Sequence, residues 1–131
     1  MIYLLDVNAL VALGFLNHEF HGRLVSWLQS GQPPQLATCS ITELAFVRVL
    51  SQAAAYGFTV AQARSLLLRL KQSPKANLSF IPDTHDVSRL PAWVKAPKQI
   101  TDGHLSKLAI ANHAILATLD ENIEGSFFIP Q

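Results

Sequence analysis

The sequence predicts an α/β fold with a central parallel β-sheet flanked by α-helices. Two observations lead to this class. Short apolar runs alternate along the chain with longer segments in which apolar residues recur at helical spacing. Several of these runs end at a polar residue, as buried parallel strands often do. The length of 131 residues is that of a single domain, so residues 1–131 are expected to form one unit.

The first part of the chain is predicted to form two strands and two helices. Residues 2–5 form an apolar run that ends at Asp6, and residues 36–39 form a second run. Residues 8–16 are mostly apolar and suit a short helix. Asn17 is then expected to cap a second helix, because the apolar residues after it recur at helical spacing.

The next two helices each follow a capping-box pattern. Ser40 and Glu43 have the spacing of such a box, and Thr59 and Gln62 have it again. Both patterns precede a stripe of apolar residues. The helices are expected at residues 40–56 and 59–72.

The last third of the chain returns to strands. Residues 77–81 predict a third strand, and the three prolines within residues 82–99 predict a loop with a short helical turn. Thr101 is expected to cap a helix that runs to residue 112. Residues 115–118 and 126–129 are the last predicted strands.

Composition excludes several classes of protein. Half of the residues are apolar and only 15% are charged, which excludes intrinsic disorder. No apolar run approaches the ~18–20 residues of a membrane span, and the first five residues lack the basic start of a signal peptide. A single cysteine, Cys39, excludes an intrachain disulfide and a cysteine-based zinc site. These features predict a cytoplasmic protein.

Four acidic residues stand at equivalent points of the predicted fold. Asp6 and Asp120 follow apolar strands, while Glu43 and Asp102 fall in the first turns of helices. In an open parallel sheet, strand carboxyl ends and the following helix N-termini share one edge. We therefore expect the four carboxylates to meet at this edge.

Such a group favours a divalent cation. Two carboxylates about 4 Å apart repel each other by roughly 4 kcal/mol at an effective dielectric constant near 20. Mg²⁺ or Mn²⁺ would relieve this repulsion, because both prefer carboxylate and water oxygens. One or two such ions could hold a phosphodiester and activate water. Asn8 and Thr118 lie two residues from Asp6 and Asp120, where they could hydrogen-bond the ligating carboxylates.

Each acid also has an ordinary structural explanation. Glu43 fits a capping box, and Asp102 suits the positive end of a helix dipole. Asp120 begins the acidic run that continues in Glu121 and could belong to a solvated turn. Asp6 is the hardest to explain without a ligand, because a carboxylate directly after a buried strand usually binds something.

The charge balance permits a polyanionic substrate. The formal charge is +1, from ten basic and nine acidic residues. If four acids occupy one site, five acids remain against ten basic residues elsewhere. Arg48, Lys98 and Lys107 are candidates to hold phosphates, although solvated surface explains each of them alone.

Four short motifs resemble one family. They are Leu5-Asp6-Val7-Asn8-Ala9-Leu10, Ile41-Thr42-Glu43-Leu44, Thr101-Asp102-Gly103-His104-Leu105 and Leu116-Ala117-Thr118-Leu119-Asp120. In this order and at these spacings they resemble the PIN-domain ribonucleases, and most of all the VapC toxins of toxin–antitoxin modules. The resemblance covers nearly the whole chain.

The resemblance implies a PIN fold and a metal-dependent endoribonuclease. Asp6, Glu43, Asp102 and Asp120 would be the acids that bind Mg²⁺ or Mn²⁺, and Thr118 matches the Ser or Thr that usually precedes the last acid. That last acid is the most variable, so Glu121 and Glu124 are alternatives to Asp120. The family cleaves RNA, is restrained by a VapB-like antitoxin and usually forms homodimers.

Two histidines, three residues apart, fall at the start of the second predicted helix, where some VapC-like sequences have a His-rich stretch. His18 and His21 could ligate a metal or contact RNA phosphate, and His21 is retained as a candidate substrate contact. A solvated helix start, with His21 partly packed, explains the same pattern.

Two other functions compete with the nuclease. A haloacid dehalogenase-type phosphatase also begins with a strand followed by Asp, but it needs a second Asp where this chain has Asn8. A PIN-like module could also bind RNA or protein without cutting. The complete set of acids argues against this second alternative.

Overall fold

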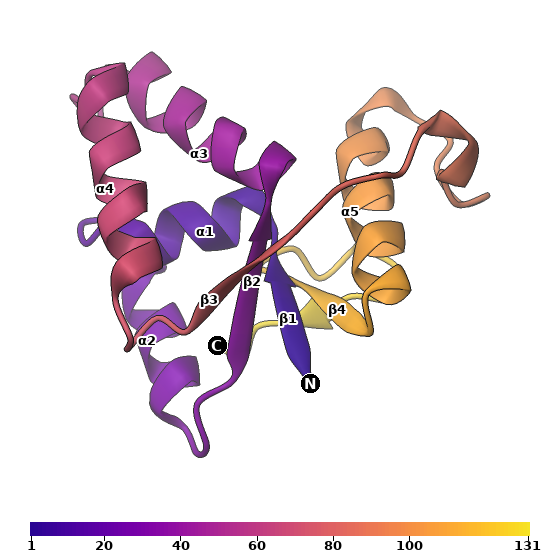
Figure 1. The fold of residues 1–131 in the computed structure, drawn as a ribbon, viewed down its shortest axis with the longest axis horizontal. Coiled ribbons are helices and arrows are strands. Elements are labelled where there is room, and N and C mark those ends of the chain that lie inside the picture. Colours follow the sequence, from indigo (N-terminus) through magenta and orange to yellow (C-terminus); the bar gives the residue numbers. More distant parts are fainter.

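The computed structural model describes residues 1–131 and contains one parallel sheet, as predicted (Figure 1). The strand order is β3-β2-β1-β4-β5, so the first strand lies in the centre. All four neighbouring pairs are parallel. The strands are β1 (Ile2–Leu5), β2 (Gln35–Cys39), β3 (Leu78–Ile81), β4 (Ala114–Thr118) and β5 (Phe127–Phe128).

Helices cover both faces of the sheet (Figure 1). The helices are α1 (Val7–Gly14), α2 (His21–Gln29), α3 (Ser40–Gln52), α4 (Val60–Gln72) and α5 (Ile100–Ala111). The first four gather on one side, while α5 lies on the other with two short 3₁₀ turns, Val87–Arg89 and Pro97–Gln99, in the chain before it. No helix combines the length and the apolar character needed to cross a bilayer.

Two apolar cores follow from the alternation of side chains along the central strand. Leu5 packs in one core with Leu10 of α1 and Phe46 of α3. The preceding residue, Leu4, packs in the other core with Leu105 of α5. All four of these leucines and Phe46 are fully buried. The sheet is thus fixed from both sides, which gives the ends of its strands a rigid frame.

Three predicted helix starts were wrong. The second helix begins at His21 with Phe20 as its cap, and not at Asn17. The last begins at Ile100 directly after a 3₁₀ turn, so Thr101 is not its cap. The capping box at Thr59 and Gln62 is confirmed by hydrogen bonds of 2.9 and 3.1 Å between them.

The third wrong start concerns the helix that carries Glu43. Thr42 Oγ1, and not the Glu43 side chain, accepts the hydrogen bond at the helix start, from the backbone N–H of Cys39 at 3.0 Å. Thr42 Oγ1 also donates to the Cys39 carbonyl at 3.1 Å. The Glu43 carboxylate is therefore not used as a helix cap. This removes the main structural explanation for the residue.

Candidate active site at the carboxyl ends of the strands

Asp6 is the central side chain of this edge of the sheet. Its backbone N–H continues the β1–β4 pairing by donating to the Ala117 carbonyl at 3.0 Å. Its side chain caps α1, because Oδ1 accepts from the backbone N–H of Ala9 at 2.8 Å. Oδ2 accepts from Thr118 Oγ1 at 2.5 Å. Only 6% of Asp6 is exposed, so these bonds fix a carboxylate that is almost buried.

Burial raises the pKa of Asp6 from 3.8 to about 6. The hydrogen bonds from Thr118 and Ala9 oppose this rise, whereas the negative charges of Asp102 and Asp120 add to it. The pKa of Asp102 is also raised, first by burial and then by the charge of Asp120. The three aspartates therefore form one electrostatic group, which we call the aspartate group.

Glu43 has a different environment. Its Oε2 accepts from Thr38 Oγ1 at 2.5 Å and lies 2.7 Å from Lys71 Nζ of α4. No hydrogen bond is made by its Oε1, so one oxygen of the carboxylate is committed and the other is free. The charge of Glu43 is balanced within the protein by a lysine.

The expected cluster of four carboxylates is thus only partly formed. All four acids follow strand ends or begin helices, as predicted, but Glu43 is engaged by Lys71. No three acidic, histidine or cysteine side chains lie close enough together to hold one metal ion as they stand. Asp6, Asp102 and Asp120 interact electrostatically with one another. Glu43 instead forms an ion pair with Lys71.

Two threonines hold the carboxylates of Asp6 and Glu43 in the same way. Thr118 is the last residue of β4 and binds Asp6, while Thr38 is the penultimate residue of β2 and binds Glu43. Both threonines are fully buried. Sequence reasoning found Thr118 and missed Thr38. The sequence feature that could have identified Thr38 is a hydroxyl-bearing residue near the end of an apolar strand, just before a helix that carries an acidic residue.

The other polar residues near the aspartate group are less constrained. Asn8 is exposed and forms no side-chain hydrogen bond to a carboxylate. Asp120 is also exposed; its backbone N–H donates to Thr118 Oγ1 at 3.0 Å, and its Oδ1 accepts from the Asn122 N–H at 2.9 Å. Glu121 and Glu124 are exposed and make no ion pair. Asp120 is therefore the acid of this turn that is tied to Asp6 through Thr118.

The predicted phosphate-binding cations do not contact the acids. Arg48, Lys98 and Lys107 are exposed and form no ion pair. The cation that does reach a predicted site residue is Lys71, which sequence reasoning missed. His21, the first residue of α2, ties this helix to α1, because its Nδ1 donates to the Ala12 carbonyl at 2.8 Å.

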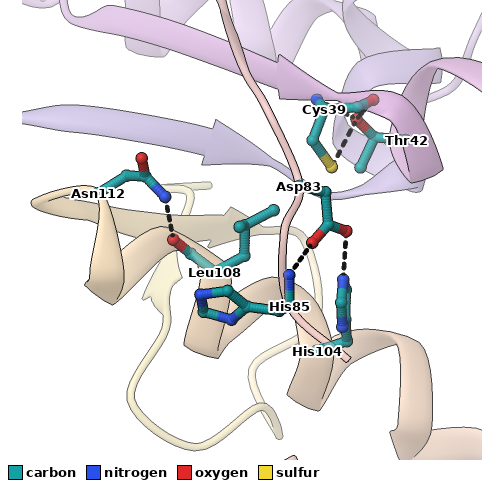
Figure 2. Close-up of polar contacts among 7 residues, drawn as sticks. All are labelled: Cys39, Thr42, Asp83, His85, His104, Leu108 and Asn112. Atoms are coloured by element: carbon teal, nitrogen blue, oxygen red, sulfur yellow. Dashed lines mark hydrogen bonds and ion pairs between the residues drawn. The ribbon is translucent and has the colours of Figure 1, made fainter. Parts of the chain in front are cut away.

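A histidine–aspartate contact fixes the helix that carries Asp102. Figure 2 shows Asp83 accepting from the backbone N–H of His85 at 3.0 Å and from His104 Nε2 at 2.5 Å. Burial raises the pKa of Asp83, but the hydrogen bonds and charges of the two histidines outweigh it and lower that pKa. His104 lies two residues after Asp102 on α5, so this contact ties the segment after β3 to the start of α5.

A second hollow of the surface lies away from these residues. It is an open groove of about 830 Å³ along α4, bordered by Phe58, Leu68 and Arg69 among others. None of the predicted site residues lines it. A smaller cleft of about 290 Å³ does reach the site, because Asn8 and Asp120 belong to its wall.

A match to a family model identifies the family to which this domain belongs. The model of the PIN domain matches residues 3–125. The chain belongs to the PIN domain family. Within that family it is 35% identical to Ribonuclease VapC44 and 34% identical to Ribonuclease VapC38, both of Mycobacterium tuberculosis. Each match covers 92% of this chain, with 87% and 86% of the relatives. This PIN domain is therefore similar to VapC ribonucleases over nearly its whole length.

Solved structures confirm the fold of this PIN domain. A crystal structure of VapBC2 from Rickettsia felis, bound to a promoter DNA fragment, matches with a TM-score of 0.62 and 17% identity, covering 98% of this chain and 97% of the other. Mycobacterium tuberculosis VapC20, a toxin that cleaves the sarcin–ricin loop, matches with a TM-score of 0.59 and 11% identity over 92% of both chains. The expectation of a PIN fold is confirmed, and the phosphatase alternative is set aside.

Proposed function

We propose that this PIN domain is a VapC-type toxin, an endoribonuclease that uses a divalent cation and is neutralised by a VapB-like antitoxin. The observation that carries the proposal is the environment of Asp6. Its nearly buried carboxylate is held by two hydrogen bonds, and its pKa is raised by burial and by the charges of Asp102 and Asp120. The pKa of Asp102 is raised as well. A group that resists ionisation in this way is expected where a cation completes the site.

The donor chemistry fits Mg²⁺ or Mn²⁺. Asp6, Asp102 and Asp120 offer carboxylate oxygens, and the only cysteine is buried next to α3 without a role at this edge. These three residues would hold the ion. Glu43 could join them through its free Oε1, or fully after leaving Lys71. When bound, the cation would neutralise the carboxylates, polarise a phosphate oxygen and make water more acidic.

The side chains of this chain then have defined tasks. Thr118 and the Ala9 N–H keep Asp6 in one orientation, and Thr38 does the same for Glu43. The contact between Asp83 and His104 fixes α5 and with it Asp102. Such preorganisation matters because a misplaced carboxylate weakens both ion binding and the alignment of the phosphodiester.

Several partners belong to the same proposal. RNA is the proposed substrate, as the names of the similar ribonucleases suggest. A VapB-like antitoxin is supported by the likeness to the VapBC2 complex of Rickettsia felis. A homodimer is proposed because exposed apolar residues lie on α3 and α4, among them Leu44 at 67% and Leu68 at 51% exposure.

The decisive experiment is RNA cleavage by the purified protein. We expect endonucleolytic products with Mg²⁺ or Mn²⁺, none with a chelator, and none from the Asp6→Asn protein. Asp86→Asn is the matched control, because Asp86 is an exposed aspartate that caps a 3₁₀ turn away from the aspartate group. Full cleavage by the Asp6→Asn protein would refute the assignment. Cation binding without cleavage of any RNA would favour a non-catalytic module.

A further inference from the structure

The smaller cleft beside Asp120 has the features of a recognition pocket. Its wall is formed by six residues, of which Asn8 comes from α1 and Leu119 and Asp120 follow β4. The other three precede α2: His18, Glu19 and Phe20. At about 290 Å³ the cleft is at the lower limit of pockets that hold whole drug-sized ligands, so it suits one planar group.

We propose that this cleft binds one unpaired nucleobase of single-stranded RNA next to the cleavage centre. The proposal rests on the proposed nuclease function and adds a substrate contact to it. Asp120 belongs both to the cleft and to the aspartate group. A base held in the cleft would therefore place its own phosphates close to Asp6 and Asp120.

An aromatic side chain forms a fixed wall of the cleft. Phe20 is 37% exposed, and its ring lies 5.8 Å from that of His18. The Arg23 guanidinium lies 5.6 Å from the centre of the Phe20 ring. Arg23 is itself held by the carbonyls of Ile129 and Pro130. Phe20 is thus an exposed ring on a supported site, which is the usual arrangement for stacking an unpaired base.

The polar groups of the cleft can read the edge of a base. His18 Nδ1 accepts from the backbone N–H of Phe20 at 3.0 Å, so in the neutral ring the proton sits on Nε2, which is a donor. Burial lowers the pKa of His18, which favours that neutral ring. Glu19 offers acceptors, and the Asn8 amide offers both kinds of group. The cleft thus presents donors and acceptors together.

The charge of the cleft selects a base rather than a phosphate. Two carboxylates, Glu19 and Asp120, line it, and no lysine or arginine does. Asp120 would be neutralised by the cation, but the Glu19 carboxylate would still repel a phosphate inside the cleft, whereas an exocyclic amino group can donate to it. Cytosine carries such a group where uracil carries a carbonyl oxygen. We therefore expect cytosine to be preferred over uracil.

Binding of short RNAs to the Asp6→Asn protein in Mg²⁺ tests the proposal. Three fluorescein-labelled single strands of equal length serve as probes in anisotropy titrations: oligocytidylate, oligouridylate and an abasic ribose–phosphate chain. We expect oligocytidylate to bind most tightly and the abasic chain least. Adding Phe20→Ala should weaken oligocytidylate binding about 5- to 100-fold and leave abasic binding unchanged. Phe20→Tyr should retain the preference, and Glu19→Gln should reduce the difference between cytosine and uracil.

The outcomes separate this proposal from the nuclease itself. Equal affinity for base-bearing and abasic chains, no binding of oligocytidylate, or an equal loss for both chains in Phe20→Ala would each overturn the cleft proposal. Cleavage by the wild-type protein is scored separately with a longer RNA. Cleavage without base dependence removes only the cleft, whereas absence of cleavage removes the proposed function whatever the binding shows.

Discussion

Thr118 and Asp6 are 112 positions apart in the sequence, yet Thr118 Oγ1 donates to Asp6 Oδ2 at 2.5 Å. The central pairing of β1 with β4 makes this contact possible, because it brings the ends of the two strands together. The same hydroxyl accepts from the backbone N–H of Asp120 at 3.0 Å. One buried threonine therefore connects two of the three residues of the aspartate group.

Replacing Thr118 should shift the pH dependence of cation binding. Thr118→Val keeps the shape but removes a hydrogen bond that lowers the pKa of Asp6, so this pKa should rise further above 6. Because the cation needs the ionised carboxylate, the pH at which half of the Mn²⁺ binding is lost should move upward by about one unit. Calorimetric titrations with Mn²⁺ across pH measure this, and Thr118→Ser should restore the original profile. An unchanged profile in Thr118→Val would show that the hydroxyl does not act through Asp6.

Asp6→Asn should stabilise the cation-free protein. The folded pKa of about 6 lies above the model-peptide value of 3.8, so the folded state prefers the protonated carboxyl. Above pH 6 the ionised group therefore destabilises the fold by about 3 kcal/mol, and this penalty fades as the pH falls through 6 towards 3.8.

The measurement is the free energy of unfolding in urea with a chelator present. Asp6→Asn should raise this free energy by on the order of 1–3 kcal/mol near pH 8 and by less near pH 5. Asp86→Asn is the control with the opposite sign, because bonds from Ser88 lower the pKa of Asp86. Destabilisation of the Asp6→Asn protein near pH 8 would mean that its hydrogen bonds outweigh the burial of charge.

The sequence predicted what depends on local pattern. The apolar runs before Asp6 and Asp120 could be recognised as strands, and parallel topology then placed the acids at one edge. The start of α3 could not be predicted in the same way. Ser40 and Glu43 have the residue types and spacing of a capping box, but in the structure Cys39 and Thr42 take those positions. Only the folded backbone decides between two such pairs.

The electrostatic partners of the acids could not be predicted at all. Lys71 reaches Glu43 because α4 packs against α3, and nothing in the two local sequences indicates that contact. The four-carboxylate group was inferred from topology, which places backbone positions and not side chains. Topology cannot show that one carboxylate is already paired with a lysine.

Gly103, next to Asp102, should not tolerate a side chain. A Cβ at this position would lie 2.2 Å from Val94 Cγ2, so the Val94 side chain, α5 or the segment over it must shift. Gly103→Ala should lower the free energy of unfolding by about 1–3 kcal/mol. The double variant with Val94→Ala should recover part of the loss, since it removes the clashing methyl group.

The matched control for this substitution is Gly22→Ala in α2. A Cβ there meets nothing within 4 Å, so the change should be neutral or stabilise the helix by up to about 1 kcal/mol. Urea denaturation of the four proteins measures the differences. If Val94→Ala recovers nothing, the close packing of Val94 on Gly103 is not what excludes the side chain.

Lys71 should weaken the binding of divalent cations. It lies 2.7 Å from Glu43 Oε2, with the two side chains 27% and 20% exposed, and its ammonium also lies 5.2 Å from the Phe80 ring centre. Lys71→Met should remove the positive charge that competes with a divalent cation for Glu43, and it leaves the Glu43 carboxylate unpaired. We expect Mn²⁺ affinity to rise about 2- to 10-fold, in line with the modest strength of a partly exposed ion pair. Calorimetric titration near pH 8 measures it, and Lys75→Met, at an exposed lysine without an ion pair, is the control.

A second substitution decides whether the gain passes through Glu43. In the Lys71→Met background, Glu43→Gln should return the affinity to the original value or below, because it removes the carboxylate that the lysine had engaged. If Lys71→Met leaves the affinity unchanged, Glu43 stands outside the cation site and its ion pair only joins α3 to α4. If the affinity rises but Glu43→Gln does not reverse it, the lysine acts through its general positive charge. Glu43 would then lose its place among the ligands, and Asp6, Asp102 and Asp120 would be the whole set.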